Sequence, residues 1–495
     1  MDLGILAFGG YLPQSRLQRA EISKMHGWYN PGLKGLAKGE RTIANWDEDA
    51  ITMAVEASRD CLTGLDRSEI SAVFMASTSF PFDDRQNAGV VADALNLKSQ
   101  LMTLDLAASQ RAGSSGLSVA LQAASGAEGP ILFIASEQRK TKAASPQEMT
   151  YGDGAAAVLV GTGEVIAKFI GAHTVSADFV DHFRGSGHAY DYAWEERWLR
   201  DEGYLKIVPD AIKAVLDKTG IAASDVTTFC FPVAMKRVAS MLAKKAGLAD
   251  EAVADNLQAT CGEAGAAHPV IMLVHALETA RPGDKILVTG FGQGCDALIF
   301  EVTDAIEKLA PRTAVSGHLA RRRADTNYAR FLTVNGLVTM EEGIRAEVDK
   351  QTGLSTHYRN RDMAQRMIGG CCSECGTLQF PKSNVCVNPN CGAIGTQEDH
   401  EFADKKARLN SFTADRLTFS PDPPAYYGMI QFEDGGRLMA DFTDIDPDQE
   451  LAVGMPMKLM FRVKDYDRNR GFRRYFWKAT PDNDDQDSAP AEAAE

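Results

Sequence analysis

The stretch Asp105-Leu-Ala-Ala-Ser-Gln-Arg-Ala-Gly-Ser-Ser-Gly-Leu117 decides the fold of this chain, because it leads a short polar turn into an Ala-rich helix. Gln110 falls at the start of that helix, where several backbone N–H groups have no partner within the helix. A glutamine amide donates and accepts hydrogen bonds, but it cannot act as a covalent nucleophile. The stretch therefore predicts a position that holds a polar ligand by hydrogen bonds, without a covalent bond to it.

Apolar runs on both sides of this stretch indicate a sheet that is covered on both faces. The runs are residues 71–76, 130–135, 156–160 and 285–289. Residues 48–64 and 208–219 have the periodicity of helices. Up to about residue 305 the chain therefore has an α/β pattern.

This α/β region repeats itself. Residues 131–135 followed by 152–160 recur as 286–290 followed by 292–300, and residues 105–113 resemble 256–264. The last pair places Gln110 opposite Cys261. Three echoes in the same order predict two related α/β halves, residues 1–165 and 166–305.

Composition limits the classes of function. At 495 residues, with 44% hydrophobic and 24% charged residues, the chain is long enough for roughly two to four domains. Its net charge of −15 argues against bulk binding to nucleic acid or a membrane surface. No apolar run reaches the ~18 residues of a membrane span, and the N-terminus lacks the basic segment of a signal peptide. We expect a cytoplasmic protein.

Beyond residue 305 the pattern changes. Residues 306–330, which include Arg321-Arg-Arg323, are predicted to form a polar linker, and 331–370 a helical connector. Residues 405–480 alternate in short segments broken by Pro and Gly turns, which predicts a small β-barrel. Residues 482–495 are acidic and Pro/Ala-rich, and we expect them to be disordered.

The nine cysteines form two sets. Four are scattered and are expected to be free thiols: Cys61, Cys230, Cys261 and Cys295. The others include the spacing Cys372-x2-Cys375-x10-Cys386-x4-Cys391, which predicts a structural zinc ion in a ribbon over residues 371–393. Cys371 is an alternative to Cys372 as a ligand, and disulfides are the weaker alternative to zinc.

The first 305 residues resemble the 3-hydroxy-3-methylglutaryl-CoA synthase family of the thiolase superfamily, especially its archaeal type, and more distantly ketoacyl synthase III. The resemblance is in Gly10-Tyr-Leu-Pro13, Lys38-Gly-Glu-Arg41, Asp47-Glu-Asp49, the 105–117 stretch, Gly152-Asp-Gly154 and Gly290-Phe-Gly292. The remainder resembles the zinc-ribbon and OB-fold family that partners thiolases and thiolase-like aldolases. The resemblance implies a duplicated thiolase-like fold followed by a zinc ribbon and an OB-type β-barrel.

The same resemblance implies that the family's catalytic residues are replaced here. Gln110 stands at the position of the acyl-forming cysteine, and Pro232 at that of the acid/base histidine. Glu263 replaces the asparagine of the oxyanion site, and Thr78 replaces a general-base glutamate. An acetyl-enzyme at the usual position is therefore excluded.

Other groups offer alternative chemistry. Gln110 would hold a thioester by hydrogen bonds, as in loading ketosynthases with glutamine at this turn, which decarboxylate. Glu263, if buried, would have a raised pKa and serve as an acid/base. Cys261, and less so Cys230, is a candidate displaced nucleophile, although a buried Cys is more often inert. His268 is expected to start a helix first and to be catalytic second.

Two basic regions are candidate ligand contacts. Arg237 falls where relatives place a basic residue near the CoA phosphate, and a solvated helix charge is the alternative. Basic residues alternate with aromatic ones over 462–477, which on an OB barrel can indicate single-stranded nucleic acid. The acidic chain and the thiolase-like region favour CoA phosphate contact or an interface instead.

Three functions remain open. The favoured one is an enzyme that makes or breaks a C–C bond next to a CoA thioester, by retro-aldol cleavage, aldol addition or decarboxylation. The first alternative is a catalytically silent subunit that binds CoA ligands or scaffolds a separate Cys-bearing thiolase. The second is an acyltransferase with Cys261 as nucleophile. The resemblance also implies a homodimer or a larger hetero-complex.

Overall fold

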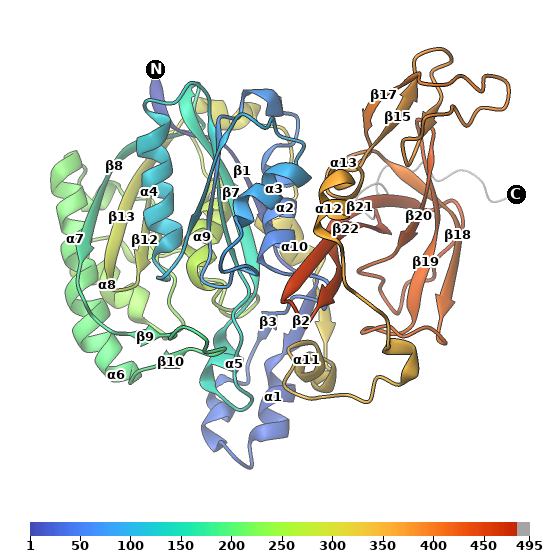
Figure 1. Cartoon of the computed structure of the whole chain (residues 1–495). Coiled ribbons are helices and arrows are strands. Elements are labelled where there is room, and N and C mark those ends of the chain that lie inside the picture. The colour runs from blue at the N-terminus through green and yellow to red at the C-terminus, as the bar shows by residue number, and fades with distance from the viewer. Residues whose placement is uncertain (483–495) are drawn as a thin grey trace, which may run out of the picture. The chain divides into compact units, whose positions relative to one another are not determined.

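The computed structural model describes residues 1–482 and divides into two compact units, Met1–Thr339 and Met340 onward (Figure 1). The predicted disordered tail lies outside the described residues except for Asp482. No helix among residues 1–482 is long and apolar enough to cross a membrane.

A nine-stranded sheet forms the centre of the first unit. Its strands are β1 (Asp2–Tyr11), β4 (Ala72–Ala76), β5 (Met102–Leu106), β6 (Ile131–Glu137), β7 (Gly154–Gly163), β8 (Ala167–Ser176), β11 (Thr228–Cys230), β12 (Lys285–Phe291) and β13 (Gly294–Val302). They lie in the order β11-β12-β13-β8-β1-β7-β6-β4-β5. The four apolar runs predicted as strands fall in β4, β6, β7 and β12.

The strand order confirms the predicted duplication. Outward from the central pair, β1-β7-β6-β4 on one side matches β8-β13-β12-β11 on the other. The directions match as well, because β6 pairs antiparallel with β7 and parallel with β4, as β12 does with β13 and β11. Only the first half continues, among the described residues, into a further strand, β5.

Helices cover the sheet in three layers. Helix α2 (Ala50–Cys61) packs on β1, β6 and β7, and α7 (Leu205–Thr219) packs on β8 and β13 at the outer side seen in Figure 1. Helices α4 (Ala112–Ala124) and α9 (His268–Leu277) contact each other and strands of both halves. Gly113 permits this contact, because a Cβ there would lie 1.9 Å from the Ala266 carbonyl oxygen.

Smaller elements complete the first unit. The remaining helices are α1 (Arg19–His26), α3 (Asn87–Ala94), α5 (Pro146–Thr150), α6 (Glu196–Trp198), α8 (Val238–Ala246), α10 (Ala314–Ala320) and α11 (Tyr328–Val334). The remaining strands form a three-stranded sheet and a hairpin. The sheet contains β14 (Arg323–Asp325), β2 (Ser15–Gln18) and β3 (Glu40–Thr42), and the hairpin contains β9 (His182–Phe183) and β10 (Tyr192–Ala193).

Residues 306–330 are not the linker that the sequence predicted. They form α10 and β14, and β14 pairs with β2. Arg321 lies over the Tyr11 ring at 5.6 Å, and Arg322 forms an ion pair with Glu40 at 3.1 Å. Short-range patterns cannot predict these contacts, because the partners lie about 300 positions earlier in the chain.

The second unit contains two small sheets. Helices α12 (Leu354–Arg359) and α13 (Arg361–Ala364) precede the ribbon strands β15 (Ile368–Cys372), β16 (Leu378–Gln379) and β17 (Gln397–Glu401). The OB strands follow: β18 (Ala407–Asp415), β19 (Ala425–Phe432), β20 (Arg437–Asp441), β21 (Pro456–Asp467) and β22 (Phe472–Pro481), in the order β20-β19-β18-β21-β22. A bridge between Phe442 and Ala479 joins the two ends of this sheet.

Candidate functional site

Three neighbouring strands bring polar side chains to one edge of the sheet. Because β4, β5 and β6 are parallel, their carboxyl ends meet at the same edge. Thr78 follows β4, Gln110 follows β5, and Glu137 is the last residue of β6. The turn before Gln110 is strained, because Ala108 has a φ of 72° in the left-handed region.

A cavity of about 540 Å³ opens at this edge. Apolar side chains that line it include Phe80, Phe82, Val180 and Phe183. Its polar lining includes Thr78, Gln110, His182, Arg184, Asp191 and Gln293. No cysteine of the described chain lines this cavity, so the cavity offers hydrogen-bonding groups but no thiol.

Gln110 is fixed by a buried guanidinium. With its carboxamide oriented to satisfy both partners, Oε1 accepts hydrogen bonds from both terminal nitrogens of Arg139, one of them at 2.6 Å. The Gln110 amide nitrogen can then only donate. Because the cation polarises the amide, its N–H groups are stronger donors than those of a free glutamine.

Arg139 is the centre of a buried charge network. Its side chain is 1% exposed, donates to Asp191 and to the Tyr151 hydroxyl, and lies 3.8 Å from the Tyr151 ring centroid. Burial alone would lower the pKa of Arg139, but the charges of Tyr151, Asp191 and Glu263 raise it above its ordinary value. The guanidinium is therefore a permanent cation beside Gln110.

Asp191 joins Arg139 to the cavity wall. Its other carboxylate oxygen accepts from Arg184 at 2.7 Å, and Arg184 also donates to the Thr78 carbonyl oxygen. Burial would raise the pKa of Asp191, but the two guanidiniums hold it below its ordinary value. Asp191 is thus an ionised bridge between two arginines.

Glu137 is a fully buried carboxylate behind the cavity. It accepts from the Thr78 backbone N–H and hydroxyl at 3.1 Å and from the Ala266 N–H at 3.1 Å. These bonds join the end of β6 to β4 and to the segment before α9. Glu137 therefore fixes Thr78, which stands at the family's general-base position.

The structure places Glu263 within electrostatic reach of Arg139 but not in the cavity lining. Its backbone pairs with Tyr151, and its carboxylate interacts electrostatically with Arg139 and His182. Burial raises the pKa of Glu263, and Arg139 opposes that rise. A proton role for Glu263 stays a prediction.

His182 faces Gln110's cavity from the β9 hairpin. Its Nδ1 lies 2.7 Å from Asp181 Oδ2, and Asp181 Oδ1 accepts from Gln293 Nε2 at 2.7 Å. The His182 side chain is 16% exposed and that of Asp181 is 5% exposed. The pair is a histidine oriented by a buried carboxylate.

Cys261 is sealed away from this cavity. It is 0% exposed, its Sγ lies 3.7 Å from the Thr42 hydroxyl, and burial raises the pKa of its thiol despite nearby Arg16. Cys230 is equally buried, and burial raises its pKa to about 12. The geometry gives neither thiol the exposed, low-pKa environment of a nucleophile.

His268 and Arg237 lie outside the cavity lining. Both ring nitrogens of His268 are engaged, with the Ala264 N–H and the Asn256 carbonyl, and burial lowers its pKa to about 4. It is a neutral residue that starts α9. Arg237 is exposed at the start of α8 with a φ of 66°, and Pro232 is half-buried just before it.

The basic residues of the OB sheet have partners within their own unit. Arg462, Arg470 and Arg474 pair with Asp444, Asp467 and Asp465, respectively. Lys464 and Arg473 lie over the rings of Phe476 and Tyr466. This pairing neutralises much of the charge that a nucleic-acid backbone would need.

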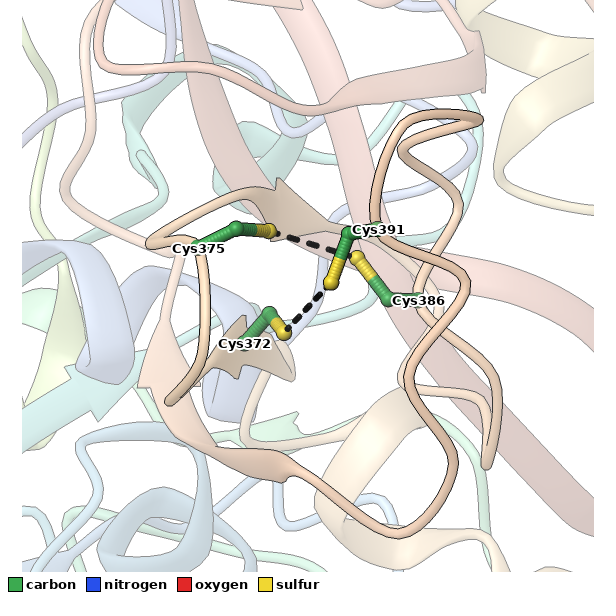
Figure 2. A group of neighbouring side chains, drawn as sticks. All are labelled: Cys372, Cys375, Cys386 and Cys391. Carbon is green, nitrogen blue, oxygen red and sulfur yellow. Dashed lines mark hydrogen bonds between the residues drawn. The ribbon is translucent and has the colours of Figure 1, made fainter.

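The four predicted zinc ligands converge (Figure 2). Their Sγ atoms lie within 4.8 Å of one another, with Cys372 to Cys391 at 3.9 Å and Cys375 to Cys386 at 3.6 Å. Tetrahedral zinc with ~2.3 Å bonds needs sulfurs ~3.8 Å apart, so the set fits the ion. Cys371 stays outside the group, with Sγ facing the Gly376 carbonyl.

Sequence reasoning missed most of the polar network. Glu137 ends the buried strand β6 and Arg139 lies two residues beyond it, and polar residues at that end of a strand are a usable signal. The insert around His182, His188 and Tyr190 resembles the synthase segment that shapes the acyl pocket, and that resemblance is a signal for His182. No pattern marks Asp181 or Asp191.

Three family models match parts of the chain. The model of 3-oxoacyl-[acyl-carrier-protein] synthase III C terminal matches residues 216–301. The model of the ChsH2 rubredoxin-like zinc ribbon domain matches 362–393, and that of the ChsH2 C-terminal OB-fold domain matches 400–462. The predicted zinc ribbon and OB fold are thereby confirmed.

Known proteins resemble the first two thirds of the chain. Hydroxymethylglutaryl-CoA synthase of Aeropyrum pernix is 30% identical over 346 residues, which cover 68% of this chain and 96% of the relative. The synthase of Methanosarcina mazei is 28% identical over 349 residues, 69% of this chain and 100% of the relative.

Solved structures agree in fold. A structure of HMG-CoA synthase complexed with CoA aligns with a TM-score of 0.57 at 20% identity, covering 71% of this chain and 96% of that one. FabH from Pseudomonas aeruginosa aligns at 0.56 with 22% identity, covering 63% and 100%. The thiolase-like fold predicted from the sequence is confirmed.

Proposed function

The chain belongs to the hydroxymethylglutaryl-CoA synthase family, and on that premise we propose that it acts on acyl-CoA thioesters without forming a cysteine acyl-enzyme. The reaction makes or breaks a C–C bond next to the thioester, by aldol, retro-aldol or decarboxylation chemistry. The observation that supports it is Gln110, at the acyl-enzyme position, lining the cavity with its amide oxygen held by Arg139.

Each of these reactions needs an enolate at the thioester, and an enolate needs fixed hydrogen-bond donors. The Gln110 amide N–H groups would donate to the thioester oxygen as its negative charge develops. Because Arg139 already holds the amide, little reorganisation is needed at that moment. Glu263 or another cavity group would move the proton.

Zinc has no part in this chemistry. Four thiolates fill its coordination sphere and leave no open position for substrate. The backbone N–H groups of Glu374 and Cys375 donate to Cys372 Sγ, as in a closed structural site. When bound, the ion would hold the ribbon strands together.

A panel of acyl-CoA thioesters tests the proposal. The purified full chain is incubated with the panel, and consumed and released thioesters are followed by mass spectrometry. Gln110→Ala should lower turnover by about 100-fold or more, the usual effect of losing one oxyanion donor. Gln122→Ala, on the exposed side of α4, is the matched control. Wild-type turnover that Gln110→Ala leaves intact would contradict the proposal.

A silent subunit is the second candidate. It is favoured by the replacement of all four family positions and by the ChsH2-type ribbon and OB fold. In that case the chain binds CoA ligands or scaffolds a separate Cys-bearing thiolase. Binding of CoA thioesters without turnover, together with a co-purifying thiolase, would support it. Turnover by the lone chain would exclude it.

We also propose a homodimer formed through the sheet. β5 is an edge strand, and it exposes Met102 and Leu104, which are 63% and 37% accessible. An unpaired apolar edge is a ready site for strand pairing. Light scattering of the wild type and of Leu104→Lys should give a dimer and a monomer, respectively.

A further inference from the structure

The hairpin segment at the cavity contains a histidine–carboxylate pair to which the reaction above gives no role. We propose that His182, oriented by Asp181 and Gln293, is the residue that moves protons at this cavity. The inference rests on the proposed function, since it names the acid/base group of the same site.

The pair has a defined orientation. Because Asp181 is buried, its ionised form requires hydrogen-bond donors, and His182 Nδ1–H and Gln293 Nε2–H supply them at 2.7 Å each. A carboxylate at Nδ1 fixes the tautomer, so that Nε2 has the free lone pair. The imidazole is therefore held as a base.

The free nitrogen belongs to a residue that lines the cavity. Nε2 of His182 has no hydrogen-bond partner among the described residues, and His182 and Gln110 line the same cavity. His268 differs, since both of its nitrogens are bonded to the backbone. Glu263 differs too, because it does not line the cavity within the described chain.

Gln293 supports the pair at some cost to the backbone. Its φ is 49°, which places a non-glycine residue in the unfavourable left-handed region. The turn between β12 and β13 holds it there, and its side chain reaches Asp181 across 112 positions. Strain of this kind at a cavity is consistent with a positioning role.

The proton transfers balance without a further reactant. In the retro-aldol direction Nε2 takes the proton of the β-hydroxyl, the Cα–Cβ bond breaks, and its electron pair becomes the thioester enolate at Gln110. The carbonyl product leaves, and the imidazolium returns the proton to Cα. In decarboxylation the imidazolium supplies the same final proton and regains one from water.

Hydrogen exchange at Cα tests this step separately. Propanoyl-CoA is incubated with the full chain in heavy water, and deuterium uptake is measured by mass spectrometry beside turnover of the acyl-CoA panel. His182→Gln should lower both rates by about 100-fold or more. His188→Gln, an exposed histidine of the same segment, is the matched control and should match the wild type.

Asp181→Asn tests the positioning role. It should lower the maximal exchange rate by about tenfold while leaving the half-saturating propanoyl-CoA concentration unchanged, and Asp181→Glu should restore part of the rate. A merely structural role would change both quantities. If His182→Gln fails to fold by circular dichroism, Asp181→Asn and Gln293→Ala provide the same comparison.

The outcomes separate the two proposals. Wild-type rates in His182→Gln, with a loss in Gln110→Ala or Glu263→Gln, would overturn the role of His182 and leave the proposed function standing. A wild-type chain that neither exchanges Cα hydrogen nor consumes any thioester would contradict the proposed function, and this inference with it.

Discussion

Each half of the first unit contains the turn before its Ala-rich helix and the turn before its last long strand. One turn of each kind lines the cavity, and the other turn of each kind is buried. Gln110 and Gln293 line the cavity, whereas their counterparts in the duplicated fold, Cys261 and Asp153, are buried together. Thr42 bonds to both members of the buried pair. Duplication thus supplies the geometry twice, and burial decides which copy can do chemistry.

The sealed pair also shows why residue type alone is a poor guide. Cys261 is the thiol at the position equivalent to Gln110, but it is 0% exposed and burial raises its pKa. A glutamine in the open turn has more chemical use than a cysteine in the closed one, since access and fixed donors matter more than intrinsic nucleophilicity.

The largest effect is expected where the halves meet. Gly113→Ala would place a Cβ 1.9 Å from the Ala266 carbonyl oxygen, so α4 and the turn Gly265–Ala267 that leads into α9 must separate. We expect a loss of about 3 kcal/mol in the free energy of unfolding, measured by urea denaturation. Gly126→Ala is the control, because nothing lies within 4 Å of its added Cβ. Equal stabilities would show that the two helices do not pack as described.

The buried acid of the sealed pair predicts a pH effect. Burial raises the pKa of Asp153 from 3.8 to about 6, against the opposing charge of Arg41. Between these values the folded chain binds more protons than the unfolded chain, so stability falls as pH rises from about 4 to 6. The shift corresponds to about 3 kcal/mol at most.

Asp153→Asn should remove that slope, because the neutral amide still accepts from the Ala44 N–H. The difference between the urea midpoints measured at pH 4.5 and at pH 7 should be smaller in this variant than in the wild type. Asp210→Asn, an exposed acid on α7, is the control and should keep the wild-type slope. Equal pH slopes in the wild type and in Asp153→Asn would contradict the assignment.

The thiol of the sealed pair should be dispensable. Cys261→Ala removes one buried sulfur, which we expect to cost about 1 kcal/mol of stability. Turnover of the acyl-CoA panel should not change, and intact-mass spectra of the wild type should contain no acyl adduct on Cys261. An acyl adduct there, lost in the variant, would establish the acyltransferase alternative.

The smallest effect is expected for Arg237, a candidate contact for the CoA phosphate in the second half of the first unit. Arg237→Ala should raise KM for the CoA thioester about fivefold and leave kcat unchanged, as expected for one exposed phosphate contact. The effect should weaken with added salt. Lys244→Ala, exposed on the same α8, is the control. No change in KM would show that Arg237 is a solvated helix charge.

Local sequence patterns predicted the fold of both units and the position of Gln110 in the candidate site. The 105–117 stretch, the echoes between the halves and the cysteine spacing are each contained in short segments, so sequence could predict the duplicated fold, the ribbon and the place of Gln110. The network around Arg139 could not be predicted, because Asp191 lies 52 positions away in a segment without periodicity. The same distance effect made residues 306–330 look like a linker.

The bond between the Ser109 hydroxyl and the Gly292 carbonyl joins two sides of the cavity that are 183 residues apart. At about 5–20 residues per second, a ribosome makes the second side roughly 10–40 s after the first. During that interval Gln110 and Arg139 are synthesised first, the hairpin of β9 and β10 follows, and the β12–β13 turn comes last. A chain interrupted anywhere in this span lacks Gln293 and the β12–β13 turn, so the cavity can be completed only when synthesis has passed that turn.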